Sequence, residues 1–169
     1  MRVTHSLPHV VAPFRRVLVV ATVAASCAGC SRGVDSALVG FVFEPPRGVK
    51  LIHEDPGPPP RATFEGGLEI RAVKGTLTGL ARGDLPSALE QAMRETGLTL
   101  PGTPRSSKGG TIPAGAVGRY EFGDARTGTL LYLVQGDGRY FAVTLTAPKT
   151  GFDRRVNALE LSMSTLRFR

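Results

Sequence analysis

The sequence predicts a domain of the α+β class, an antiparallel sheet with helices packed on it. In the last third of the chain, apolar residues alternate or run almost continuously over 116–122, 129–134 and 139–145, and short glycine-containing connections join these segments. This pattern is typical of successive hairpin strands. Two other segments, 84–97 and 152–166, carry apolar residues at helical spacing. Strands, a helix, three strands and a final helix, in this order, indicate helices covering a sheet.

The first thirty residues have the organisation of an export signal. Arg2, Arg15 and Arg16 carry the only charges there if histidine is taken as neutral, and the apolar run 17–25 is followed by small residues. A basic region, an apolar run and a small-residue cleavage zone are typical of a secretory signal. The apolar run is about half of the roughly 20 residues that a membrane-spanning helix needs. We therefore predict a signal peptide over residues 1–29.

The stretch Ala28-Gly29-Cys30-Ser31 resembles the end of the lipobox of bacterial lipoproteins. The resemblance implies lipid transfer to the thiol of Cys30, cleavage before it, acylation of the new amino group and a membrane anchor. Cys27 stands where the lipobox usually has an aliphatic residue, and it is a second lipidation candidate in the weaker frame 24–27. A disulfide or redox pair between the two cysteines is a third reading. Because Ser31 is not aspartate, the resemblance implies sorting to the outer membrane, facing the periplasm, in a Gram-negative host.

Cleavage at Cys30 divides the rest of the chain into a lipidated tether, 30–36, and a single domain, 37–169, of ordinary domain size. No cysteine follows Cys30, so the stability of the domain must come from an apolar core rather than from disulfides. Loss of the three leader arginines lowers the formal net charge from +7 to +4. The remaining basic residues are mostly scattered, whereas nucleic-acid binding favours a concentrated basic face. We predict no nucleic-acid partner.

The first part of the domain carries the less regular strand patterns. Residues 37–43 are rich in β-branched and aromatic side chains, and 48–53 form a shorter strand candidate. The prolines of 56–60 predict a stiff surface loop, because proline lacks an N–H donor and restricts its neighbours. Residues 61–77 predict two strands that turn at Gly66-Gly67.

Both helices have clear local signatures. Asp84 is a good N-cap, Pro86 lies in the first turn, and Gly97 can adopt the left-handed conformation that ends a helix. Between these residues lies one apolar stripe: Leu85, Ala88, Leu89, Ala92 and Met93. Residues 101–110 predict a polar loop. The final helix is predicted from spacings of four, three, four and three residues between apolar side chains, Phe152, Val156, Leu159, Met163 and Leu166.

The order of these elements resembles the Mog1/PsbP-like group, which includes small bacterial lipoproteins. The resemblance covers most of 37–168 and rests on the stretch 41–46 (FVFEPP), the helix from Asp84 and the closing stretch 118–168. It implies an α/β/α sandwich. Members are typically non-enzymatic assembly or binding proteins, so no catalytic set transfers. The long proline loop and the weak first hairpin depart from the pattern and leave the pairing of the first strands open.

No motif for catalysis or phosphate binding is complete. Lys149-Thr150-Gly151 matches the K-T-G of penicillin-binding enzymes, but no serine has a lysine three residues later to supply their S-x-x-K. Arg82-Gly83-Asp84 spells an adhesion tripeptide, yet Asp84 is better explained as the helix cap. Glu121 and Asp124 flank a turn, where acidic residues are common. Ser106 to Gly110 lack the P-loop spacing, which favours a flexible loop.

Two further sets of side chains allow a functional and a structural reading. His53-Glu54-Asp55 have metal-ligand chemistry, but His53 is the only histidine after position 30, and zinc sites without cysteine or further histidines are unusual. A solvated turn is the favoured interpretation. Tyr120, Tyr132 and Tyr140 fall on neighbouring strands, where they form either a binding surface or cross-strand packing; packing is favoured.

From these observations we expect a membrane-anchored, non-enzymatic binding or assembly module of the cell envelope, without cofactor or metal, whose partner is an envelope protein. The alternative is a small-ligand or metal-binding periplasmic module with a cleft near His53 and the proline loop, which requires a pocket of about 300 Å³ or more. Hydrolysis of cell-wall material is a third, disfavoured hypothesis.

Overall fold

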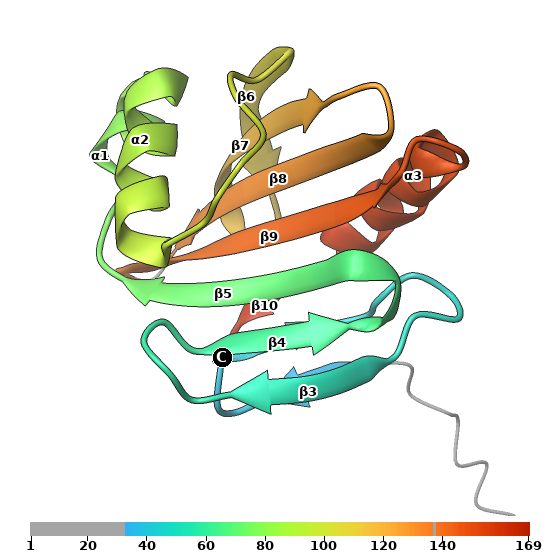
Figure 1. Cartoon of the computed structure of the whole chain (residues 1–169). Helices are drawn as coiled ribbons and strands as arrows, with labels where there is room; N and C mark the ends of the chain where they lie inside the picture. The colour runs from blue at the N-terminus through green and yellow to red at the C-terminus, as the bar shows by residue number, and fades with distance from the viewer. Residues whose placement is uncertain (1–32, 137) are drawn as a thin grey trace, which may run out of the picture. The chain divides into compact units, whose positions relative to one another are not determined.

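The computed structural model describes residues 33–136 and 138–169, which form two sheets and three α-helices (Figure 1). The seven-stranded sheet has the order β3-β4-β5-β9-β8-β7-β6. Its strands are β3 (Leu51–Asp55), β4 (Arg61–Phe64), β5 (Leu68–Lys74), β6 (Ser106–Ile112), β7 (Gly115–Gly123), β8 (Thr127–Gly136) and β9 (Arg139–Pro148). The three-stranded sheet, β1-β2-β10, comprises β1 (Val34–Ser36), β2 (Phe41–Phe43) and β10 (Arg167–Phe168). The helices are α1 (Thr78–Arg82), α2 (Leu85–Thr96) and α3 (Phe152–Met163).

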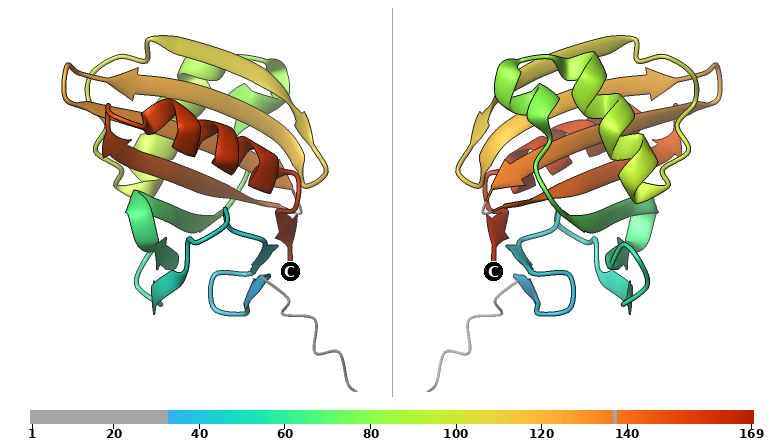
Figure 2. Two further views of the ribbon diagram at one scale, coloured as in Figure 1. Left: turned by 90° about the vertical axis from the view of Figure 1, so that its right-hand side faces the viewer. Right: turned by 90° about the vertical axis from the view of Figure 1, so that its left-hand side faces the viewer.

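Helices lie on both faces of the seven-stranded sheet, as Figure 2 shows from two sides. All strand pairs in both sheets are antiparallel. Successive side chains along each strand point to opposite faces, so the sheet has an apolar cluster on each side. One face packs against α1 and α2, and the other packs against α3 and the small sheet. The predicted α+β class, an antiparallel sheet with helices packed on it, is confirmed. Within the described residues, no helix combines the length and apolar character needed to span a membrane.

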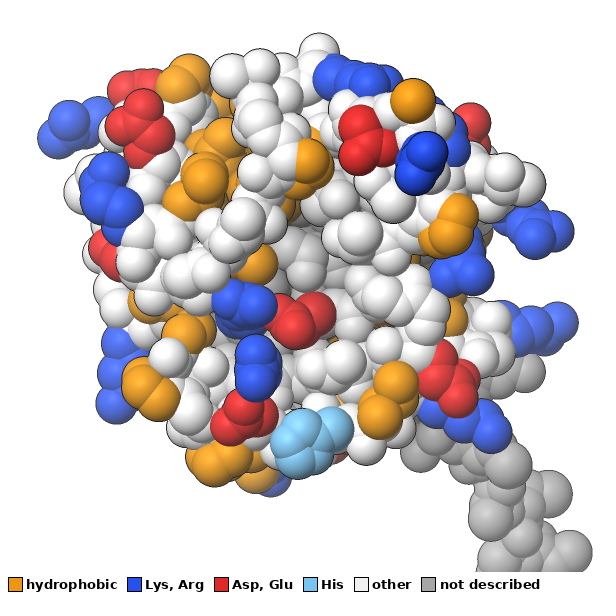
Figure 3. Space-filling view, in the orientation of Figure 1, with side chains coloured by type: hydrophobic (Ala, Val, Ile, Leu, Met, Phe, Trp, Pro, Cys, Tyr) orange, Lys and Arg blue, Asp and Glu red, His pale blue; other side chains and the backbone are white. Residues whose placement is uncertain are grey.

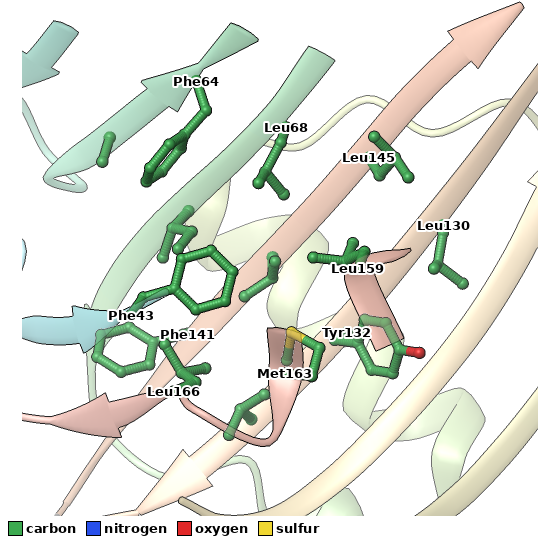
Figure 4. Packing of buried hydrophobic residues seen from close by; sticks show 14 of the residues in the cluster. Phe43, Phe64, Leu68, Leu130, Tyr132, Phe141, Leu145, Leu159, Met163 and Leu166 are labelled. Carbon is green, nitrogen blue, oxygen red and sulfur yellow. The ribbon is translucent and has the colours of Figure 1, made fainter. Parts of the chain in front are cut away.

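The larger apolar cluster lies between the seven-stranded sheet, the small sheet and α3 (Figure 4). Phenylalanines dominate where the sheets meet: the rings of Phe41 and Phe141 lie 6.2 Å apart in an edge-on arrangement. Leu159 and Met163 extend this cluster from α3. Burying such side chains stabilises the fold by roughly 1.5–3 kcal/mol each. This is how a domain without internal cysteines stays folded.

Several predicted elements are confirmed. Strands β7, β8 and β9 cover the three predicted segments and extend them, and β4 and β5 turn at Gly66-Gly67. The N-cap prediction holds because the carboxylate of Asp84 accepts a hydrogen bond from the Ser87 N–H at 3.2 Å. Gly97 ends α2 with a φ of 63°.

Several predicted boundaries were wrong. The strand predicted over 48–53 is β3, Leu51–Asp55. Residues 34–36, expected in the tether, form β1, while 37–40 form a turn rather than the start of a strand. Residues 106–110 belong to β6 and not to a loop. The last helix ends at Met163, and hydrogen bonds from Thr165 to Ser162 and from Leu166 to Met163 form a tighter turn that leads into β10. Leu166 lies in that turn, outside the helix, and its side chain is fully buried.

A threonine-lined hollow as the candidate functional site

One part of the seven-stranded sheet is not covered by a helix. Helices α1 and α2 pack over the end of the sheet that carries Tyr120, Tyr140 and Leu131. On the same face, further along, the inward positions carry hydroxyl groups instead of apolar side chains. The register places Thr63 beside Glu69, Glu69 beside Thr144, and Thr146 beside Thr129. Four strands therefore bring hydroxyl and ionisable side chains together on one surface.

These residues line a hollow with a volume of about 630 Å³. Its wall is the chain that leaves α2, residues 97–101, and the turn at Gly67 closes one side. Figure 3 shows this face hollowed near its centre, where most side chains are neither apolar nor charged. The volume falls in the range of ordinary small-ligand sites, roughly 300–1,000 Å³.

The floor of the hollow is fixed by contacts among its own residues. The hydroxyl oxygens of Thr129 and Thr146 lie 3.2 Å apart, and Thr129 and Thr144 are only 5% and 8% exposed. Gly67 has a φ of 79°, and a Cβ there would lie 2.1 Å from the carbonyl oxygen of Thr146. Only glycine allows the β4–β5 turn to approach β9 so closely. The hollow is thus shaped before any ligand arrives.

One ion pair borders the threonines. The guanidinium of Arg71 donates from Nε to the carboxylate of Glu69 and from Nη1 to the carbonyl oxygen of Thr96, at 2.8 Å. Both charged side chains are largely shielded from solvent, at 18% and 22% exposed. The charges of Arg71 and Glu69 cancel, and Arg71 connects β5 to the end of α2. The lining therefore offers hydrogen-bond donors and acceptors with no net charge, which suits an uncharged polar group.

The predicted metal-ligand candidates do not converge. His53 is exposed on β3, at one edge of the sheet. Glu54 accepts a hydrogen bond from the Ser36 hydroxyl, and Asp55 pairs with Arg61 at 2.8 Å. The Gly57 N–H, together with Arg61, lowers the pKa of Asp55. Over the described parts of the chain, no three histidine, cysteine or acidic side chains gather closely enough to hold a metal ion.

The two acidic residues near the β7–β8 turn have separate roles. Glu121 lies 3.4 Å from Arg119. Asp124 accepts hydrogen bonds from the backbone of its own turn, at 2.6 Å from Arg126 and 2.8 Å from Thr127. The Thr127 N–H, followed by that of Arg126, lowers the pKa of Asp124. Each carboxylate therefore stabilises local structure.

The residues of the three short motifs have structural roles in the fold. Lys149 lies 5.6 Å from the centre of the Phe152 ring, and Gly151 precedes α3 with a φ of 81°. Asp84 of the adhesion-like tripeptide caps α2. Residues 106–110 run along the exposed edge strand β6, paired with β7, so the flexible-loop interpretation was wrong.

All three tyrosines support the sheet, as the favoured interpretation states. Tyr120 and Tyr140 are fully buried beneath α2, and their hydroxyls donate to the Leu85 carbonyl and the Glu95 carboxylate, each at 2.8 Å. Tyr132 lies on the opposite face and donates to Glu160 at 3.3 Å. Burial is the main cause that raises the pKa of Tyr120 to about 12, and the negative charge of Asp84 is the second cause. Burial also raises the pKa of Tyr132 to about 12.

Sequence reasoning missed the hollow. A signal was present, because Thr129, Thr144 and Thr146 interrupt otherwise apolar strands at positions of one parity within each strand. Recognising that they share one surface requires the register between β8, β9 and β5.

Comparison with known proteins supports the fold. No protein-family model matches the chain, and no curated protein sequence matches it. The solution structure of the cyanobacterial PsbP protein CyanoP, from Synechocystis sp. PCC 6803, is similar with a TM-score of 0.58 and 14% identity, over 86% of this chain and 99% of that one. A crystal structure from Bacteroides thetaiotaomicron has a TM-score of 0.51 and 16% identity over 81% of this chain. This chain spans about half, 48%, of that protein. At these identities the likeness shows the fold alone, and the predicted PsbP-like fold is confirmed.

Proposed function

We propose that the chain is a non-enzymatic binding module of the cell envelope, tethered to a membrane by lipid on Cys30. The observation that supports binding is the preformed hollow, whose floor presents the hydroxyls of Thr129, Thr144 and Thr146. In this proposal an envelope protein inserts an uncharged polar segment there and exchanges hydrogen bonds with the hydroxyls. The tether rests on the lipobox resemblance, since the leader and Cys30 lie outside the described residues.

The chemistry of the lining favours binding over catalysis. A threonine hydroxyl becomes a nucleophile when a base lies next to it. Glu69 is the carboxylate among the residues that line the hollow, and it is held by Arg71. His53 is not one of the lining residues. The hydroxyls are therefore placed to donate and accept hydrogen bonds.

A second candidate occupant is a small, neutral, polar molecule. The volume of about 630 Å³ supports it, since it meets the size that the ligand-binding alternative required. The position differs from the cleft expected for this alternative: the hollow lies between β4, β5, β8, β9 and the end of α2, and not beside His53.

The anchor is tested by intact mass spectrometry of the membrane-extracted protein, wild type beside Cys30→Ala. We expect a mature mass that begins at Cys30 and includes acyl chains, and its loss in the variant. Acylation of Cys27 instead would move the tether by three residues and replace Cys30 as the site. A cleaved protein without lipid would contradict the anchor and leave a freely diffusing binding protein.

The hollow is tested by crosslinking in intact membranes. A photoreactive residue in place of Thr99, which is exposed on the wall, should form a discrete adduct with one envelope protein. Thr144→Val keeps the side-chain shape but removes the hydroxyl, so the adduct should fall roughly fivefold, the loss of about 1 kcal/mol of hydrogen bonding. The matched control, Thr150→Val, is exposed and outside the hollow, and should leave the adduct unchanged.

Native mass spectrometry of the same samples separates the two occupants. A small molecule that co-purifies with wild type and is lost in Thr144→Val would support the second candidate in place of a protein segment. If neither an adduct nor a bound molecule depends on Thr144, the hollow is not the binding site.

A further inference from the structure

A separate groove runs along α3, on the face of the sheet opposite the helices α1 and α2. It lies between α3 and the segment 46–49 that follows β2, and its volume is about 480 Å³. The turn at Glu65-Gly66 closes one end. Leu68 is a lining residue of both cavities, but none of the threonines of the hollow lines this groove.

The floor of the groove is apolar. Leu68, Leu145 and Leu159 form its deepest part and are 2%, 5% and 1% exposed. Val49 and Ala158 extend it toward the surface and are half-buried. An apolar floor of this kind favours the hydrocarbon part of a ligand.

The rim of the groove is basic. Arg47, Arg154 and Arg155 line it and are all exposed. Within residues 33–136 and 138–169, no ion pair involves these arginines. Arg155 donates to the carbonyl oxygen of Gly66 at 2.9 Å, which holds its side chain at the groove. The acidic residue on the rim, Glu65, accepts a hydrogen bond from the Lys50 N–H at 3.3 Å. The rim therefore carries an excess of positive charge beside an apolar floor.

We propose that this groove binds a single-chain anionic amphiphile, with a carboxylate or phosphate head on the arginines and an acyl chain along the leucine floor. Guanidinium groups bind such heads through paired hydrogen bonds. The charge of the rim selects an anion, and the floor selects a hydrocarbon stem. The three leucines are at most 5% exposed and form the base of the groove. The acyl chain in this proposal therefore lies above them, against the half-buried Val49 and Ala158, between the 46–49 segment and α3. This proposal does not depend on the function of the threonine hollow.

Photolabelling of the full chain with a C12 carboxylate that carries a diazirine near the end of its chain tests the proposal. With the Cys30→Ala variant in nonionic detergent, labelled peptides should come from 46–49 and from α3. Dodecyl phosphate should compete, whereas dodecanol and inorganic phosphate should each compete at least about tenfold less well. Arg154→Gln should lower labelling about tenfold, as expected for the loss of one charge-assisted hydrogen bond. The control Arg82→Gln is exposed on α1 and should have no effect.

Other results would overturn the proposal in identifiable ways. Equal competition by dodecanol would mean that the arginines do not select the ligand. Equal competition by inorganic phosphate would mean that the apolar floor is not used. Protection of the groove by anionic vesicles or by an acidic peptide, but not by dodecyl phosphate, would assign the surface to a membrane or to a protein. Ala158→Phe, which fills the groove and leaves the arginines in place, should abolish labelling; retained labelling would place the chain elsewhere.

Discussion

Each buried tyrosine side chain should have a measurable effect on how the stability of the domain depends on pH. An unfolded tyrosine titrates near pH 10, whereas burial raises the pKa of Tyr120 and of Tyr132 to about 12 in the folded chain. The pKa of Tyr140 is also raised, mainly by burial and secondly by its hydrogen bond to the Glu95 carboxylate. Between pH 10 and 12 the unfolded chain loses phenolic protons that the folded chain keeps, so the free energy of unfolding must fall as pH rises. Below pH 10 this contribution is fully present.

We predict that urea unfolding midpoints stay level from pH 7 to about pH 9.5 and then fall steeply up to pH 12. Tyr120→Phe should lower the free energy of unfolding by about 1 kcal/mol at pH 7, because the hydrogen bond to Leu85 is lost. The same variant should show a shallower alkaline decline, because one titrating phenol is gone. An identical decline in wild type and variant would show that Tyr120 does not titrate between the two states.

At the scale of elements, local chemistry decides which segments the sequence can predict. Helix α2 combines a cap, a first-turn proline, a stripe and a terminal glycine within 84–97, and each is visible in a short window. Strand β6 has no buried face, since 106–111 are exposed, and its backbone pairing with β7 leaves no periodicity to detect. The threonine hollow combines Thr63 with Thr144 through Glu69 of β5. A single sequence specifies such long-range register weakly.

The cap of α2 should contribute to the stability of the whole element. Asp84→Ala removes the acceptor for the Ser87 N–H, and we predict a loss of about 1 kcal/mol in the free energy of unfolding, within the 0.5–2 kcal/mol typical of caps. Chemical denaturation at pH 7 measures this change. Glu90→Ala, exposed in the middle of the same helix, serves as the control and should stay within about 0.5 kcal/mol of wild type. Equal losses in both variants would mean that Asp84 acts through charge or propensity and not as a cap.

At the scale of the whole domain, the end of the described chain joins the two sheets. Phe168 of β10 stacks on Phe141 of β9, with ring centres 4.3 Å apart and planes within 15°. Strand β10 pairs with β2, and the Arg169 N–H donates to the Gly40 carbonyl at 2.9 Å. The small sheet is therefore attached to the large one through side-chain packing, since β10 and β9 belong to different sheets.

This attachment predicts coupling between two residues that are 27 positions apart in the chain. In a double-mutant cycle, Phe141→Leu and Phe168→Leu should interact by about 0.5–1.5 kcal/mol, the value of an aromatic pair beyond its buried area. Phe122→Leu, in the cluster beneath α2 on the opposite face, should combine additively with Phe168→Leu, because distant sites without shared partners do not couple. Coupling in the first cycle and additivity in the second would show that the stack links the sheets as one cooperative unit. Additivity in both cycles would mean that β10 is held by its backbone pairing with β2, and that other contacts between the sheets, such as Phe41 against Phe141, join them instead of the Phe168 stack.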